Sequence, residues 1–291
     1  MKNSDITDPL FREAVEAIDT GDINTLERLL NEHPQLVSQR LDVPKEGYFQ
    51  HPYLLWFIAD NPIRHEKLPA NIVEITRLIM ERVRKHAPET FLQQLSYAAG
   101  LASTGRIPRE CGVQIELMDL FIDAGVAPGN GVSELAHGNI EVAEHLIKRG
   151  GELTLPAAVG LGWKDDIIHL TSSATESEIE VALVVAAFFG KADIISFLID
   201  KGVDLNGHPN DFYGFHSHAS ALHQAVYSGS LESVKLLVEA GAKLDARDRV
   251  YQGTPLGWAM YMQTEEGYDE EGKRKFVKIE AYLKQKEKEI R

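Results

Sequence analysis

The strongest constraint on this chain is a phrase that repeats along it. Each copy places apolar residues at helical spacing after a small or polar residue, and the clearest copies end in glycine. Clear copies lie at residues 138–150, 190–202 and 229–241, with a fainter one at 113–125. Degenerate copies with the same apolar spacing lie at residues 21–33, 71–83, 162–174 and 276–285. Such repetition predicts a repeat architecture rather than one globular core.

Within each copy the apolar residues share one face of a helix. In residues 231–240 that face holds Leu231, Val234, Leu237 and Val238, three or four residues apart except for the last two. A second, shorter and more apolar helix is expected upstream, most clearly at residues 181–189, 220–228 and 254–262. One such helix pair cannot bury both of its apolar faces, so the pairs must stack. The sequence therefore predicts an all-α helical solenoid.

The later repeats resemble a known family. The segments TPLGWA (residues 254–259) and ALHQA (residues 221–225) are similar to the T-P-L-H-x-A start of the ankyrin repeat. The segment GSLESVKLLVEAGA (residues 229–242) is similar to the second half of that repeat. The resemblance implies an all-α ankyrin-repeat solenoid of a stand-alone bacterial type. Its irregular spacing implies divergent repeats and enlarged loop fingers.

The domain organisation follows from the same pattern. No linker rich in proline, glycine or serine interrupts the chain, so we expect residues 1–291 to form a single ankyrin-repeat domain of about eight helix-pair units. The terminal repeats of a solenoid must cover its core. We expect residues 1–34 to form an N-terminal cap unit and residues 273–291 to form a C-terminal capping helix.

Composition excludes several classes of protein. The chain has 30 Lys+Arg and 44 Asp+Glu, a net charge of −14, which opposes non-specific binding to nucleic acid. The single cysteine, Cys111, excludes a disulfide framework and favours a reducing compartment. No signal peptide or membrane-spanning run is expected. We expect a cytoplasmic monomer that binds neither membranes nor nucleic acid.

The resemblance also implies where a partner binds. In ankyrin proteins the residues before the turn glycine face the concave surface, and aromatic side chains there commonly contact partners. Together with residues of the loop fingers, these positions predict a protein-binding surface, whose partner the sequence does not identify. The predicted partner-binding residues are Phe189, Tyr213, Phe215, His216, Tyr227, Tyr251 and Tyr261. The alternative is that the phenylalanines simply pack between repeats.

A metal site is the alternative hypothesis for the same region. His216 and His218 lie two residues apart, with His208 nearby, and imidazoles of this kind bind zinc-type ions. A metal-binding regulator or an enzyme would then use the His-rich loop, residues 208–223. The simpler interpretation is that His223 and its neighbours bond the loop backbone. Because catalytic and cofactor-binding motifs are absent from the sequence, we expect neither an enzyme nor a cofactor. We expect the side chains of Trp56, Trp163 and Trp258 to lie in the core.

Overall fold

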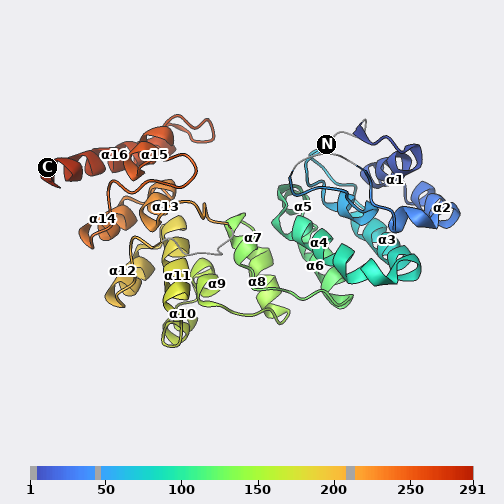
Figure 1. Cartoon of the computed structure of the whole chain (residues 1–291), viewed down its shortest axis with the longest axis horizontal. Helices are drawn as coiled ribbons and strands as arrows, with labels where there is room; N and C mark the ends of the chain where they lie inside the picture. The colour runs from blue at the N-terminus through green and yellow to red at the C-terminus, as the bar shows by residue number, and fades with distance from the viewer. Residues whose placement is uncertain (1–4, 43–46, 208–213, 291) are drawn as a thin grey trace. The chain divides into compact units, whose positions relative to one another are not determined.

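The computed structural model describes residues 5–42, 47–207 and 214–290. The chain divides into two compact units, Met1–Glu152 (unit 1) and Leu153–Arg291 (unit 2), each described by itself below. Within these described residues the regular structure is entirely helical, which confirms the all-α prediction (Figure 1). No helix in this part of the chain is long and apolar enough to cross a membrane.

Unit 1 is a stack of helix pairs in two layers. The first helices of the pairs contact one another in an inner layer, and the second helices do so in an outer layer. The inner layer holds α1 (Pro9–Thr20), η3 (Leu54–Ala59), α4 (Phe91–Thr104) and α7 (Val132–Ala136). The outer layer holds α2 (Ile23–Glu32), α3 (Ile72–His86), α6 (Gln114–Asp123) and α8 (Ile140–Lys148). Short helices η2 (Pro34–Val37), η4 (Pro88–Thr90) and α5 (Arg106–Glu110) join them.

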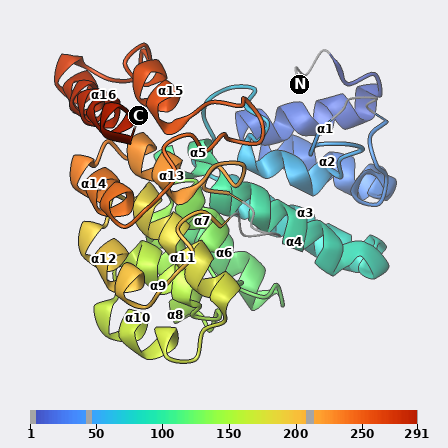
Figure 2. The ribbon, with the colours of Figure 1, turned by 60° about the vertical axis from the view of Figure 1, so that its left-hand side comes forward.

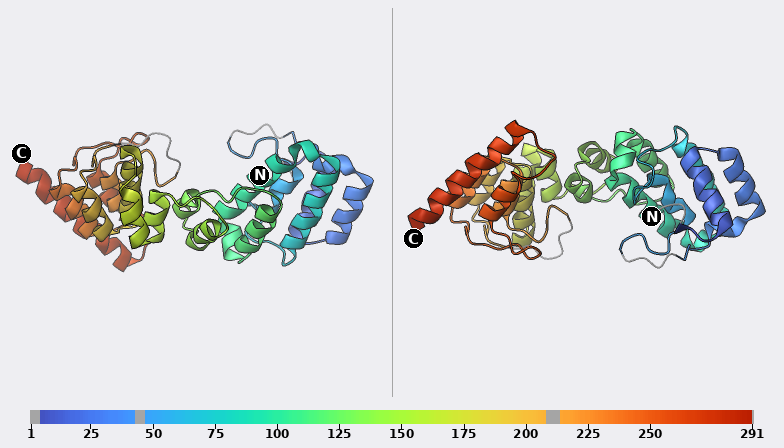
Figure 3. Two further views of the ribbon diagram at one scale, coloured as in Figure 1. Left: turned by 90° about the horizontal axis from the view of Figure 1, so that it is seen from below. Right: turned by 90° about the horizontal axis from the view of Figure 1, so that it is seen from above.

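Unit 2 repeats the same two-layer arrangement. Its inner layer holds α9 (Leu155–Leu161), α11 (Glu176–Phe188), α13 (Ala221–Tyr227) and α15 (Pro255–Tyr261). Its outer helices are α10 (Lys164–Thr171), α12 (Ala192–Asp200), α14 (Leu231–Glu239) and α16 (Glu270–Ile290). In Figure 1 the labels α13, α11 and α9 follow one row, and α14, α12 and α10 follow the other. The long red helix α16 lies beside α15, as Figures 2 and 3 show, and also contacts α14.

Helix boundaries follow from local sequence chemistry. Asp8 caps α1, because its Oδ1 accepts the N–H groups of Leu10 and Phe11 at 2.9 and 3.1 Å. The outer helices α6, α8, α12 and α14 are each followed closely by a glycine in the left-handed region, such as Gly241 with φ 104°, a conformation that residues with a Cβ rarely adopt. The repeated phrase is therefore a helix followed by its stop signal.

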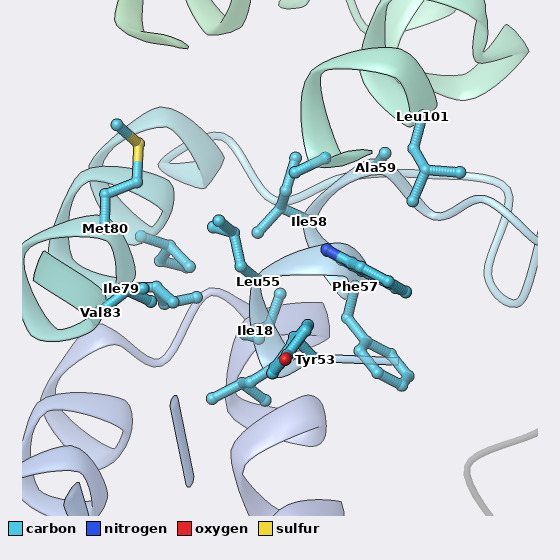
Figure 4. Packing of buried hydrophobic residues seen from close by; sticks show 14 of the residues in the cluster. Ile18, Tyr53, Leu55, Phe57, Ile58, Ala59, Ile79, Met80, Val83 and Leu101 are labelled. Atoms are coloured by element: carbon cyan, nitrogen blue, oxygen red, sulfur yellow. The ribbon is translucent and has the colours of Figure 1, made fainter. Parts of the chain in front are cut away.

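The core of unit 1 shows how an atypical repeat is accommodated. The segment LLWFIA forms η3, whose six residues are all buried among α1, α3 and α4. Figure 4 shows side chains of η3 directed toward those of neighbouring helices, including Ile18, Ile79 and Leu101. The Trp56 ring stacks on Tyr97 with 3.9 Å between ring centroids. Bulky side chains therefore fill the space in this inner layer where ankyrin-like repeats usually carry alanine.

Two expectations from the sequence, at residues 105–112 and 181–189, need correction, and a third, the single domain, remains open. Residues 105–112 widen the spacing between copies of the repeated phrase and therefore predict an insertion in a loop, but this segment contains α5. The inner helix expected at residues 181–189 begins earlier, at Glu176, because Thr175 and Glu178 form a capping box. The single continuous domain of residues 1–291, with its cap units at 1–34 and 273–291, stays a prediction.

Candidate partner-binding surface

Two loops of unit 2 carry most of the predicted binding residues. The long finger (residues 201–220) connects α12 to α13, and its residues 208–213 lie outside the described part. The short finger (residues 240–254) connects α14 to α15. Predicted residues Tyr213 and His208 therefore have no structural description. The other predicted residues lie on these fingers or at the C-terminal ends of inner helices.

Phe215 is the anchor of the long finger. Its side chain is only 2% exposed, and its ring centroid lies 4.9 Å from Phe188 and 5.9 Å from Phe189. Gln224, fully buried on α13, donates from Nε2 to the carbonyl oxygens of Phe215 and His216. The Phe215 ring therefore packs against the inner helices of its own unit, and its role in partner binding stays a prediction.

The backbone of the long finger is strained at this anchor. Phe215 and His216 have φ values of 46° and 50°, in the left-handed region that residues with a Cβ rarely adopt. Such conformations cost on the order of 1–3 kcal/mol each. The two residues together cost about 2–6 kcal/mol. Burial of the phenylalanine contributes about 1.5–3 kcal/mol, and each hydrogen bond from Gln224 adds about 1 kcal/mol. Packing of Phe215, supported by the Gln224 hydrogen bonds, therefore offsets the local strain.

Half-buried rings form the central part of the surface. Tyr227, at the end of α13, stacks on Phe188 at 5.3 Å between centroids and lies 4.4 Å from the His216 ring. Burial lowers the pKa of His216, and a charge on His218 lowers it further. Phe189 is also half-buried, and the Lys191 ammonium lies 5.7 Å from the centroid of its ring. At neutral pH this region therefore presents uncharged His216 next to aromatic rings.

Asp248 organises the short finger. Its carboxylate is fully buried and accepts backbone N–H groups from Val250, Tyr251 and Gly253 and the indole N–H of Trp258, at 2.6–3.1 Å. Burial raises the pKa of Asp248, but these donors together lower it below its usual value. The charged carboxylate therefore fixes the backbone from which Tyr251 projects.

His223 joins the two fingers. His223 Nδ1 lies 2.8 Å from Ser220 Oγ, and its Nε2 lies 3.0 Å from the carbonyl oxygen of Gly253. The prediction that His223 bonds the loop backbone is confirmed. This bridge fixes the start of α13 relative to the short finger.

Exposed side chains form the outer part of the surface. Tyr251 is 78% exposed and Tyr261, at the end of α15, is 62% exposed. Apolar Val250 and Met260 are also exposed on the same two elements. A hydrogen bond with Glu265, followed by the negative charge of that residue, raises the pKa of Tyr261. We call the residues Phe189, His216, Tyr227, Tyr251 and Tyr261 the aromatic surface.

Trp258 was missed as a member of this region. It was expected in the core, as were Trp56 and Trp163, but only Trp56 is buried, whereas Trp163 and Trp258 are half-buried. The Trp258 ring lies 5.6 Å from His216 and 5.9 Å from His218. Its position in TPLGWA matches a core position of the repeat, so no local signal distinguished it from an ordinary core residue.

The described residues do not assemble a metal site. His216 and His218 lie close, with 6.0 Å between ring centroids, and the Nε2 of His218 lies 4.0 Å from Asp248 Oδ1. Among residues 5–42, 47–207 and 214–290, no group of three or more His, Cys, Asp or Glu side chains could hold a metal ion. The metal alternative based on His208, His216 and His218 therefore gains no support from this part of the chain.

Comparisons with known proteins address the repeats directly. A family model described as ankyrin repeats, in three copies, matches residues 133–248. This match runs from α7 to Asp248 of the short finger. The chain is also similar to the crystal structure of the human ASB11 ankyrin repeat domain, at 14% identity and a TM-score of 0.33, covering 93% of this chain and 96% of that one. No curated protein matches.

Proposed function

Since this chain is an ankyrin-repeat protein, with family-model repeats over residues 133–248, we propose that it binds another protein through the aromatic surface of unit 2. Ankyrin repeats generally serve as protein-interaction modules, because stacked repeats present an extended surface that a partner can contact. The proposed role is binding rather than catalysis, without a cofactor.

The observation that carries this proposal is the exposure of two tyrosines on firmly held elements. Tyr251 and Tyr261 are both more than half exposed. Hydrogen bonds to Asp248 hold the short finger that carries Tyr251, and Tyr261 is held as the last residue of α15. A tyrosine side chain offers a large contact area and loses little conformational entropy on binding. Exposed aromatic residues on ordered backbone are the usual anchors of a protein interface.

Charge favours some partners over others. The chain carries a net charge of −14, which opposes a polyanionic partner such as nucleic acid. We therefore propose a protein partner, bound by a monomer of this chain. A cytoplasmic location belongs to the same proposal.

The test is capture of partners from the native host by matched variants. We expect the Tyr251→Ala/Tyr261→Ala double variant to lose the partner that the wild-type protein recovers, since each truncation of an interface anchor costs about 2 kcal/mol or more. Recovery would be compared by quantitative mass spectrometry at equal bait concentration.

The matched control is Ile168→Ala. Ile168 is 60% exposed on the outer helix α10, so its truncation removes exposed apolar area away from the aromatic surface. We expect this variant to recover the partner at the wild-type level. Equal recovery by all three baits would place the binding surface elsewhere.

A further inference from the structure

Phe215 and His216 of the long finger lie on the inner helices of their own unit. The Phe215 ring fills the space beside Phe188 and Phe189. The backbone carbonyl oxygens of Phe215 and His216 accept hydrogen bonds from the side-chain amide of Gln224. His216 then lies against Tyr227 at 4.4 Å. An aromatic side chain in an apolar pocket, with backbone groups bonded beside it, is how a groove binds a peptide segment.

Contacts, rather than local preference, hold this segment in place. Phe215 and His216 both have positive φ values, a conformation that persists for such residues only where the surroundings determine it. The binding capacity therefore belongs to the helices: the side chains of Phe188 and Phe189 and the amide of Gln224. Any segment with the same chemistry can use these groups.

We propose that residues 214–218 occupy a site formed by Phe188, Phe189 and Gln224 until a partner segment replaces them. His216 therefore belongs to the aromatic surface only while these residues are bound there, and the other four residues of that surface remain in place. The partner segment inserts a phenylalanine side chain beside Phe188 and Phe189 and presents a backbone carbonyl to Gln224. The location of the partner rests on the proposed function, whereas replacement of residues 214–218 can be tested without any partner.

Unit 1 contains a comparable arrangement. Phe49, which lies between η2 and η3 in the sequence, is 8% exposed and packs on Phe57 at 5.3 Å between centroids. The hydroxyl of Tyr97, on inner helix α4, donates to the carbonyl oxygen of Tyr48. In both units a phenylalanine from a segment between helices thus packs on the inner layer, and an inner-helix side chain donates a hydrogen bond to a backbone carbonyl of that segment.

The probe is a synthetic peptide that copies residues 207–220, GHPNDFYGFHSHAS, made with heavy-isotope phenylalanine. The full-length Phe215→Ala variant leaves the pocket empty. We expect it to bind this peptide at least about tenfold more tightly than the wild-type protein, in which the attached segment competes at high effective concentration. Isothermal titration calorimetry measures the dissociation constant of the peptide for the variant and for the wild-type protein.

Two controls make the result specific. Ser217 is exposed on the same finger, so Ser217→Ala should bind the peptide as weakly as the wild-type protein does. A peptide with alanine in place of Phe215 should not bind the Phe215→Ala chain. The proposal is overturned if the folded Phe215→Ala chain binds no more tightly than wild type, or if the alanine peptide binds equally well.

Hydrogen exchange on the wild-type protein covers the case in which Phe215→Ala does not fold. Excess peptide should speed exchange of the amides at residues 214–219 by displacing them, and the heavy label separates the two copies by mass. Unchanged exchange overturns the proposal. Neither outcome depends on Tyr251 or Tyr261, so failure here and failure of the proposed function are distinguishable.

Discussion

At the scale of single residues, His216 couples the aromatic surface to pH. Burial, and then a charge on His218, hold its pKa below the ordinary value in the folded protein. In the unfolded chain the pKa returns to about 6.5, so below that pH the unfolded chain binds the extra proton first. The contribution of His216 to stability is therefore complete above about pH 6.5 and is lost as the pH falls below that value.

Because protonation of His216 favours the unfolded chain, we expect the His216→Gln variant to lose less stability than the wild-type protein as the pH falls. Between about pH 7.5 and pH 5.5 the Tm of the wild-type protein should fall further than the Tm of this variant. Differential scanning fluorimetry at both pH values measures the difference. His169→Gln, a change at an exposed histidine of α10, should retain the wild-type fall. An identical fall in His216→Gln would contradict the assignment.

Arg64 carries a buried charge whose removal should lower the unfolding free energy substantially. Its side chain is 1% exposed and donates from Nη2 to Asp19 at 2.7 Å, with Asp60 Oδ1 at 3.7 Å. Arg64→Met would leave the buried Asp60 carboxylate and the largely buried Asp19 carboxylate without this cation, so we expect a loss of about 3–5 kcal/mol in unfolding free energy. Urea unfolding measures it.

An exposed arginine provides the comparison for Arg64. Arg28 is 49% exposed and pairs with Glu13 and Glu32 at 2.9 Å. Arg28→Met should cost no more than about 1 kcal/mol, because solvent screens such pairs. Similar losses in the two variants would mean that the Arg64 cluster is not held by its charges.

At the scale of helices, α11 shows the effect of a cap on length. Thr175 Oγ1 accepts the Glu178 N–H at 3.3 Å, and Glu178 Oε2 accepts the Thr175 N–H at 2.8 Å. Removing this cap in Thr175→Ala should lower the unfolding free energy by about 1 kcal/mol. Ser177→Ala, an exposed change in the same first turn, should have a smaller effect. Equal urea midpoints for the two variants would contradict the role of the cap.

The outer helices were the most predictable elements. Every copy of the repeated phrase coincides with one of them, because apolar spacing and a closing glycine are local signals. The fingers were less predictable. Burial of Phe215 depends on Gln224 and on phenylalanines about 25 residues upstream, so no local pattern marks it. Tyr251 and Tyr261 are exposed, and their role in binding stays a prediction, whereas Trp258, expected in the core, is half-buried.

At the scale of the whole molecule, the single continuous domain can be tested by following each unit separately. Ile79 in unit 1 and Leu237 in unit 2 are both fully buried, and truncation of either to alanine should cost about 2–5 kcal/mol. In one continuous solenoid, repeats stabilise their neighbours, so each variant should lower the urea midpoint of both units. Hydrogen exchange of peptides from each unit measures the two midpoints. A shift confined to the mutated unit would mean two independent domains.

The burial of Phe215 also sets how much partner a cell must contain before binding occurs. A ligand that needs the vacated pocket has an apparent Kd equal to its intrinsic Kd divided by the fraction of molecules in which the pocket is empty. If the finger is seated in about 99% of molecules, the apparent Kd rises about a hundredfold. The bound finger therefore raises the partner concentration at which binding occurs. Substitutions that only loosen the finger would sensitise the protein without altering a single contact with its partner.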